Sequence, residues 1–129
     1  MTDSTTALII EDDPHSAKIL EIMLNREGVS ATLINNPLNV QMVLGSMSVP
    51  AVIFVDLEMP HLNGYEVLSL IRESLGDGVC VAAYTVHSSE ANAAVDKGFN
   101  GFFSKPLNAV TFPANLRRLM NGDRVWALN

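Results

Sequence analysis

The chain has little cysteine and little positive charge, and each shortage excludes a class of protein. Its single cysteine, Cys80, allows no disulfide within the chain and no zinc site built from several cysteines. Eight lysines and arginines stand against fourteen aspartates and glutamates, which gives a formal net charge of −6. Because nucleic-acid binding depends on basic residues that contact phosphates, we expect no direct contact with nucleic acid.

Long hydrophobic runs are missing as well. No apolar stretch approaches the roughly 20 residues that span a bilayer, and no basic residues precede the first apolar run as they do in a signal peptide. We therefore expect no membrane contact and a cytoplasmic location. With 129 residues, the chain has room for a single domain. We place its core at about 7–120 and interpret 121–129 as a C-terminal tail or the start of a linker.

Short apolar runs alternate with amphipathic segments along the chain. The runs lack polar alternation, which is typical of strands that are buried on both faces. The pattern predicts an α/β fold with a doubly wound, five-stranded parallel sheet in the order 2-1-3-4-5 and helices on both faces. The expected strands are 7–10, 30–34, 51–55, 79–84 and 101–103. The expected helices are 15–25, 38–46 (with Leu38, Met42 and Val43 on one face), 63–75, 89–96 and one that includes 116–120.

Prolines and capping residues indicate where two of these helices begin. Asp13 is suited to be the N-cap of the first helix, with Pro14 at its first position. Pro113 falls where the last helix would normally be well advanced, and a proline inside a helix removes a hydrogen bond. We therefore predict that the last helix begins late, with Thr111 as its cap.

Acidic residues follow the first and third expected strands. Glu11, Asp12 and Asp13 come after the first, and Asp56 ends the third. In the predicted order these two strand ends meet where the order reverses, which is where such sheets bind ligands. Two carboxylates ~5 Å apart repel by about 3 kcal/mol at an effective dielectric near 20, so the cluster requires a proton or a cation. Oxygen ligands suit Mg²⁺, which suggests a Mg²⁺ site near phosphate chemistry.

Asp56 and two further residues form a site suited to phosphoryl transfer. Asp56 can act as a nucleophile and carry a phosphoryl group as an acyl phosphate. Lys105, at the end of the fifth strand, can neutralise phosphoryl oxygens, and Thr85, at the end of the fourth, can donate its hydroxyl to one. Each residue also has an ordinary structural explanation: a loop lysine before Pro106, a β-forming threonine, and solvated loop carboxylates.

Four segments of the chain resemble, in their order and spacing, the receiver domain of bacterial response regulators, which are proteins of two-component signal transduction. They are LIIEDDP, VIFVDLEMPHLNGYEVL, VAAYT and FFSKP, and they span nearly the whole chain. The resemblance implies that Asp56 accepts the phosphoryl group and that Glu11, Asp12, Asp56 and the backbone carbonyl of Glu58 hold Mg²⁺. Met59-Pro60 and Gly64 fall in the expected turn after the acceptor.

The resemblance also implies a conformational switch. Thr85 and Lys105 would bind the phosphoryl oxygens, and their inward shift would change the face from the fourth strand to the fifth helix. Phe102 matches the aromatic switch position of the family, although an aromatic on a short strand is more commonly part of a core. The Lys105–Pro106 bond is often cis in relatives. Glu58 and His87 occupy positions that tune dephosphorylation in the family.

The implied partners are proteins. A histidine kinase or a histidine phosphotransfer protein would supply the phosphoryl group, and a downstream protein target or a missing output domain would respond. Homodimerisation is a further implication, although Pro113 makes the usual dimer surface of helix 4, strand 5 and helix 5 less certain. The chain would not be an enzyme beyond the self-catalysed transfer onto Asp56.

Two alternatives remain open. A degenerate receiver would serve only as a docking module, but the complete set of site residues argues against this. A phosphohydrolase with an aspartate nucleophile would share the parallel sheet. That family generally has a second aspartate two residues after the nucleophile, where this chain has Glu58, and a cap domain that 129 residues cannot hold.

Overall fold

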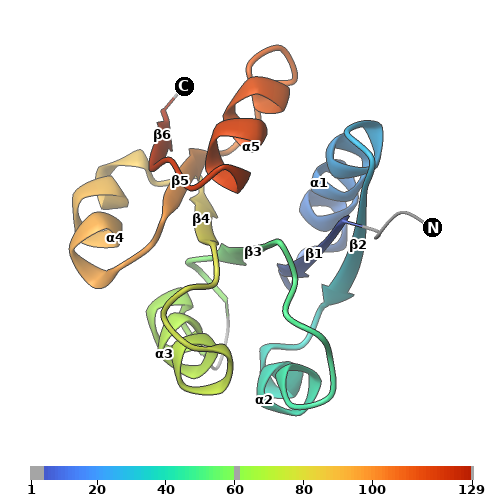
Figure 1. The fold of residues 1–129 in the computed structure, drawn as a ribbon. Helices are drawn as coiled ribbons and strands as arrows, with labels where there is room; N and C mark the ends of the chain where they lie inside the picture. The colour runs from blue at the N-terminus through green and yellow to red at the C-terminus, as the bar shows by residue number, and fades with distance from the viewer. Residues whose placement is uncertain (1–4, 60–61, 129) are drawn as a thin grey trace.

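A parallel sheet forms the centre of the molecule in the computed structural model, which describes residues 5–59 and 62–128. Its strands lie in the order β2-β1-β3-β4-β5-β6, and helices cover both faces (Figure 1). The strands are β1 (Thr5–Ile10), β2 (Val29–Ile34), β3 (Val52–Asp56), β4 (Val81–Thr85), β5 (Gly101–Ser104) and β6 (Val125–Ala127). The helices are α1 (Pro14–Arg26), α2 (Val40–Leu44), α3 (Gly64–Leu75), α4 (Ala91–Lys97) and α5 (Phe112–Met120), with 3₁₀ turns at Pro37–Asn39 and Ser88–Glu90.

The predicted fold class and the order of the first five strands are confirmed, but the predicted number of strands is wrong. The described residues form a sixth strand, β6, which pairs in parallel with β5 and places Trp126 beside Phe102. The centroids of these two rings lie 6.3 Å apart. A segment of three residues is too short to show a strand pattern in the sequence. The strand is stabilised by its hydrogen bonds to the edge of β5 and by the contact between Trp126 and Phe102. It lies within 121–129, which the sequence indicated as a tail or linker.

Two hydrophobic layers hold the sheet between the helices. One layer packs α2, α3 and α4 against the face that includes Ile53 and Val55. The other packs α1 and α5 against the face that includes Val52 and Phe54. Every residue of β3 and of β4 is buried, because successive side chains enter opposite layers. The carboxyl ends of these central strands are therefore firmly held.

The first helix begins as the sequence predicts. Asp13 is the N-cap of α1, its carboxylate accepts hydrogen bonds from the backbone N–H groups of His15 and Ser16, and Pro14 occupies the first turn. The short helix α2 differs from the prediction. Leu38 and Met42 are exposed, Val43 is half-buried against the core, and the fully buried residues of α2 are Val40 and Leu44.

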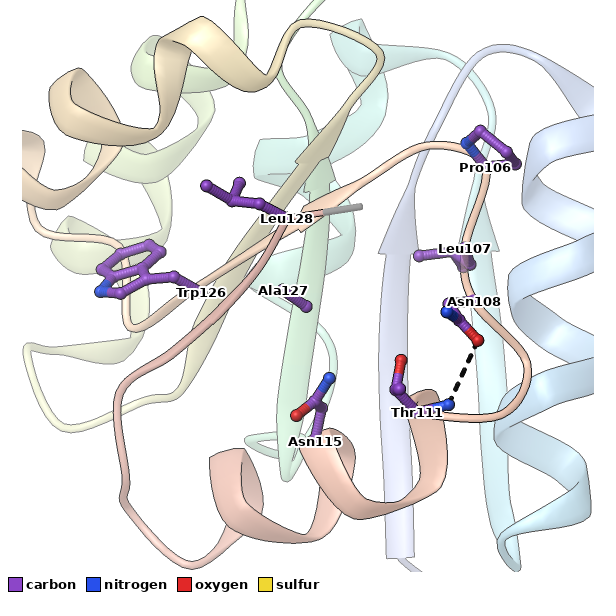
Figure 2. A pocket seen from close by; sticks show the side chains of 8 residues that line it. All are labelled: Pro106, Leu107, Asn108, Thr111, Asn115, Trp126, Ala127 and Leu128. Carbon is purple, nitrogen blue, oxygen red and sulfur yellow. Dashed lines mark hydrogen bonds between the residues drawn. The ribbon is translucent and has the colours of Figure 1, made fainter.

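The last helix, α5, begins late, at Phe112, with Pro113 in its first turn, as predicted. Thr111 is the N-cap residue of α5, as predicted, but its side chain makes no capping hydrogen bond. Instead, Asn108 Oδ1 accepts hydrogen bonds from the backbone N–H groups of Val110, at 2.9 Å, and Thr111, at 3.3 Å, and the second of these bonds is drawn in Figure 2. Among the described residues, no helix has the length and apolarity needed to cross a membrane.

Candidate functional site

The acidic residues that follow β1 and β3 meet at one edge of the sheet. The two strands are neighbours, with Ile10 opposite Val55, so Glu11 and Asp56 extend from adjacent strand ends. Glu11, Asp12 and Asp56 each offer a carboxylate oxygen, and these atoms lie within 4.8 Å of one another. Glu11 is fully buried and Asp56 is 6% exposed. The structure therefore brings together three of the four acidic residues, while Asp13 caps α1.

Lys105 joins this cluster from the far side of β4. Its Nζ lies 2.6 Å from Glu11 Oε1 and 3.5 Å from Asp56 Oδ2. Because β4 separates β3 from β5, the side chain has to cross the end of β4, and Nζ lies 4.5 Å from the centre of the Tyr84 ring. The Lys105–Pro106 peptide bond is cis. The ammonium thus lies among both buried carboxylates and an aromatic ring.

Burial and mutual repulsion govern the ionisation of the carboxyl groups. Burial, followed by the hydrogen bond and charge of Glu11, raises the pKa of Asp56 to about 8, against the opposing charge of Lys105. Burial also disfavours the charged form of Glu11, but hydrogen bonds with Asp56 and Lys105 outweigh it and lower the pKa of Glu11. Partial burial and the neighbouring acidic groups raise the pKa of Asp12. A cation at the site would favour the ionised form of Asp56.

The loop after β3 fixes the orientation of Asp56. The backbone N–H of Glu58 donates to Asp56 Oδ1 at 3.0 Å, so the other oxygen, Oδ2, faces Lys105. Gly64 begins α3 close to this loop, where a Cβ would lie 2.7 Å from Leu57 Cα. Only glycine fits this approach, which accounts for the predicted place of Gly64 in the turn. Pro60, predicted in the same turn, lies outside the described residues.

Thr85 and His87 are linked through Glu58. The hydroxyl of Thr85, which is buried, donates to Glu58 Oε1 at 3.4 Å and accepts from the backbone N–H of His87 at 3.3 Å. The same Glu58 oxygen lies 2.6 Å from His87 Nε2. Glu58 therefore contacts Asp56 through its backbone and Thr85 through its side chain. The sequence singled out these positions but did not indicate their contacts.

Phe102 lies apart from the acidic cluster, and its side chain is fully buried. It pairs in register with Ala83 of β4 and Trp126 of β6. The predicted role of Phe102 as a switch stays a prediction.

Tyr84 is a residue of the site that the sequence did not indicate. This residue pairs in register with Asp56, is 1% exposed, and places its ring beneath Lys105. A bulky aromatic after two alanines and directly before Thr85 is the one feature of the sequence that could have indicated it.

Two grooves flank the loop that follows Lys105. One, of about 410 Å³, opens beside the site between the start of α1 and the ends of β4 and β5, and its lining is mostly apolar, with Ile19, Val86 and Pro106 among its residues. The other, of about 560 Å³, lies between this loop, α5 and β6, where Asn108, Asn115 and Trp126 contribute to its lining (Figure 2). The loop therefore connects the site to both surfaces.

The fold and the site define a flavodoxin-like α/β domain with a carboxylate and lysine cluster at the point where the strand order reverses. The model of the response regulator receiver domain family matches residues 7–117, and the chain belongs to this family. Receiver domains are signalling modules of two-component systems, and this chain is one of them.

Curated relatives differ in how much of their length the chain covers. An uncharacterized 14.6 kDa protein of Leptolyngbya boryana is 30% identical over 116 residues, which are 88% of this chain and 85% of that protein. The transcriptional regulatory protein KdpE of Mycobacterium tuberculosis is 28% identical over 113 residues, 88% of this chain but only half of the relative. In the hybrid signal transduction histidine kinase C of Dictyostelium discoideum, the match, 29% identical, covers 88% of this chain and 10% of the relative.

Solved structures share the fold at lower identity. A putative response regulator from Chloroflexus aurantiacus has a TM-score of 0.83 at 20% identity, covering 92% of this chain and 99% of that one. The receiver domain of a sensor histidine kinase from Pseudomonas aeruginosa, solved with a magnesium ion coordinated in its active site cleft, has a TM-score of 0.80 at 23% identity, with coverage of 92% and 99%. These structures support the fold.

Proposed function

We propose that this receiver domain accepts a phosphoryl group on Asp56 from a phosphohistidine and uses it to switch a protein-binding surface. One observation carries the proposal: Asp56 Oδ2 faces Lys105 at 3.5 Å, inside a cluster of three carboxylates at the switch point of the sheet. A carboxylate can be the nucleophile here because the lysine can neutralise the oxygens of the incoming phosphoryl group.

The transfer is a single displacement. A carboxylate oxygen of ionised Asp56 forms a bond to phosphorus while the bond from phosphorus to the imidazole nitrogen breaks, and the imidazole, already protonated on its other ring nitrogen, leaves as the neutral ring with the electron pair. The product is an acyl phosphate on Asp56. Lys105 would then shift from Glu11 toward a phosphoryl oxygen, and Thr85 would turn its hydroxyl from Glu58 to another. These two movements would change the surface from β4 to α5, including the region of Phe102.

The carboxylate cluster fits a divalent cation. Its donors are all oxygens, as Mg²⁺ prefers, and three of them already lie within 4.8 Å of one another. Glu11, Asp12, Asp56 and the backbone carbonyl of Glu58 would hold the ion. When bound, it would neutralise negative charge and favour the ionised form of Asp56.

The phosphoryl donor would be a histidine kinase or a histidine phosphotransfer protein. The apolar groove that is lined by Lys105, Ile19, Val86 and Pro106 would offer such a partner a contact surface next to the site lysine. The response would reach a downstream protein target or an output domain; KdpE, for comparison, extends well beyond the half of its length that this chain matches. We further propose that residues 1–129 form one receiver domain that acts in the cytoplasm without direct contact with nucleic acid.

Homodimerisation belongs to the same proposal, with one modification. The edge of β5 is paired with β6, so a dimer built on α4, β5 and α5 would include β6 at its surface.

The test is phosphorylation by a small donor. Incubation with acetyl phosphate and Mg²⁺ should add the mass of one phosphoryl group to the wild-type chain and none to Asp56→Asn, because the amide cannot form the acyl phosphate. Omission of Mg²⁺ should slow the reaction by at least tenfold. Asp13→Asn is the matched control, since Asp13 caps α1 outside the cluster, and it should be phosphorylated normally.

Other outcomes identify the alternatives. Absence of modification in the wild type, with beryllofluoride also failing to bind, would contradict the proposal and favour a docking module. Continuous turnover of a phosphomonoester would favour the phosphohydrolase.

A further inference from the structure

Tyr84 lies at the centre of the site although it carries none of the roles proposed so far. In the sheet it stands opposite Asp56 on one side and Phe103 on the other. Its side chain is 1% exposed, and its ring packs edge-on against Phe54 with the centroids 6.2 Å apart. Because two neighbouring strands and the core enclose it, the ring has a fixed position.

This fixed ring lies under the path of the Lys105 side chain. A lysine has four rotatable bonds, and Lys105 has to cross β4 before its ammonium reaches Glu11 and Asp56. Its Nζ lies 4.5 Å from the centre of the Tyr84 ring. The face of an aromatic ring attracts a cation at such a distance. The ring thus provides a third contact for Lys105, after the two carboxylates, and the only uncharged one of the three.

The hydroxyl of Tyr84 is placed differently from its ring. It is enclosed and makes no hydrogen bond of regular geometry with the described residues, but the Glu11 carboxylate is near enough for a weaker hydrogen-bond interaction with it. Glu11 is close enough to act electrostatically on the hydroxyl. Lys105 Nζ donates a short hydrogen bond of 2.6 Å to Glu11 Oε1. If Lys105 moves to a phosphoryl oxygen, a buried carboxylate loses this partner, which is costly unless another donor replaces it.

We propose that Tyr84 is a positioning residue for phosphoryl transfer to Asp56. Its ring holds the Lys105 ammonium over the acceptor, and its hydroxyl donates to Glu11 once Lys105 has moved to the phosphoryl group. The inference about the moving lysine rests on the proposed function, whereas the contact between ring and lysine exists in the resting chain.

Three variants separate the ring from the hydroxyl. Tyr84→Phe keeps the ring and removes the hydroxyl, and Tyr84→Met removes both while it keeps much of the volume. Phe103→Leu is the matched control, because Phe103 is a buried aromatic that packs on Phe54 and pairs with Tyr84. If Tyr84→Met fails to fold, Tyr84→Leu replaces it, and Tyr84→Phe is informative in either case.

The first measurement follows Lys105 in the resting protein by NMR. Protons above a ring face are shielded, so the Lys105 side-chain signals should keep their upfield positions in Tyr84→Phe and Phe103→Leu. They should lose the shielding in Tyr84→Met. Unchanged Lys105 signals in Tyr84→Met would overturn the role of the ring.

The second measurement is the rate of phosphorylation by acetyl phosphate with Mg²⁺. Loss of the ring should slow Tyr84→Met by about tenfold, in keeping with the strength of a desolvated cation–π contact. Tyr84→Phe should be slowed by about threefold, and Phe103→Leu should react at the wild-type rate. A Tyr84→Phe rate equal to the wild type would overturn the role of the hydroxyl, and equal slowing in Phe103→Leu would show a purely structural effect.

The two measurements also separate this inference from the proposed function. If the wild type takes up no phosphoryl group, the proposed function fails, and the NMR comparison still tests whether Tyr84 holds Lys105.

Discussion

Asp56 and Glu11 lie side by side at the ends of β3 and β1, and both carboxyl groups are almost entirely removed from water. Two buried like charges repel strongly, so at neutral pH one group of the pair binds a proton. Lys105 lies closer to Glu11 than to Asp56, which is why Glu11 is the ionised member. The pair therefore shares one proton in the absence of a cation, and binding of a cation would favour release of that proton.

The stability of the cation-free chain should depend on pH through Asp56. Folding raises the pKa of Asp56 from its ordinary value of 3.8 to about 8. Between these values the folded chain holds a proton that the unfolded chain has released. The free energy of unfolding should therefore fall as the pH rises from 5 to 8, by at most about 1.4 kcal/mol per pH unit from this group.

Urea unfolding in EDTA at several pH values measures this effect. Asp56→Asn, which has no proton to lose at this position, should show a weaker decline than the wild type over the same range. An excess of Mg²⁺ should reduce the decline in the wild type, since a cation favours the ionised carboxylate. Parallel curves for the wild type and Asp56→Asn would contradict the prediction.

At the scale of elements, the local sequence determines where two of the helices begin, but it does not reveal every residue that stabilises those starts. The start of α1 could be predicted because Asp13 and Pro14 act on adjacent residues. The late start of α5 could also be predicted from Pro113. The residue that stabilises that start could not, since Asn108 lies four residues before Phe112 and acts through the turn rather than as the cap.

The turn before α5 should therefore depend on Asn108 more than on Thr111. Asn108→Ala removes two hydrogen bonds to backbone N–H groups and should lower the free energy of unfolding by about 1 kcal/mol. Thr111→Ala should change it by less than about 0.5 kcal/mol, because the Thr111 side chain makes no capping bond. Chemical denaturation of both variants provides the comparison. A larger loss in Thr111→Ala would show that the cap is made by Thr111.

The candidate site shows the same division between local and distant determinants. The meeting of Glu11, Asp12 and Asp56 could be predicted, since it requires only two strand ends and the order of the sheet. The position of Tyr84 under Lys105 could not, because it depends on how a long side chain crosses a strand that is distant in sequence. The bridge from Glu58 to Thr85 and His87 depends likewise on side-chain conformations that no spacing reveals.

At the scale of the whole molecule, β6 changes which strand forms the border of the sheet. The pairing of β6 with β5 covers an edge that would otherwise present unpaired backbone groups. The chain reaches this edge after α5, so residues beyond the region matched by the family model, 7–117, complete the sheet. A core that ends at 120, as the sequence indicated, omits this strand.

Removal of the Trp126 side chain should loosen this border. Trp126 is half-buried and packs on Phe102, so Trp126→Ala should lower the free energy of unfolding by about 1–3 kcal/mol. Leu128→Ala is the control, because Leu128 is 53% exposed, and it should have an effect below about 0.5 kcal/mol. Thermal and urea unfolding would measure both, and equal effects would show that β6 contributes no specific packing.

The contact between Trp126 and Phe102 has a practical consequence. Trp126 is the single tryptophan of the chain, so the intrinsic emission of the protein excited at long wavelength comes from one indole ring. That ring lies against Phe102, which is predicted to be the aromatic switch residue. A displacement of Phe102 would change the polarity around the indole and hence the wavelength and intensity of its fluorescence emission. The chain therefore carries its own optical reporter at the place where a switch would act.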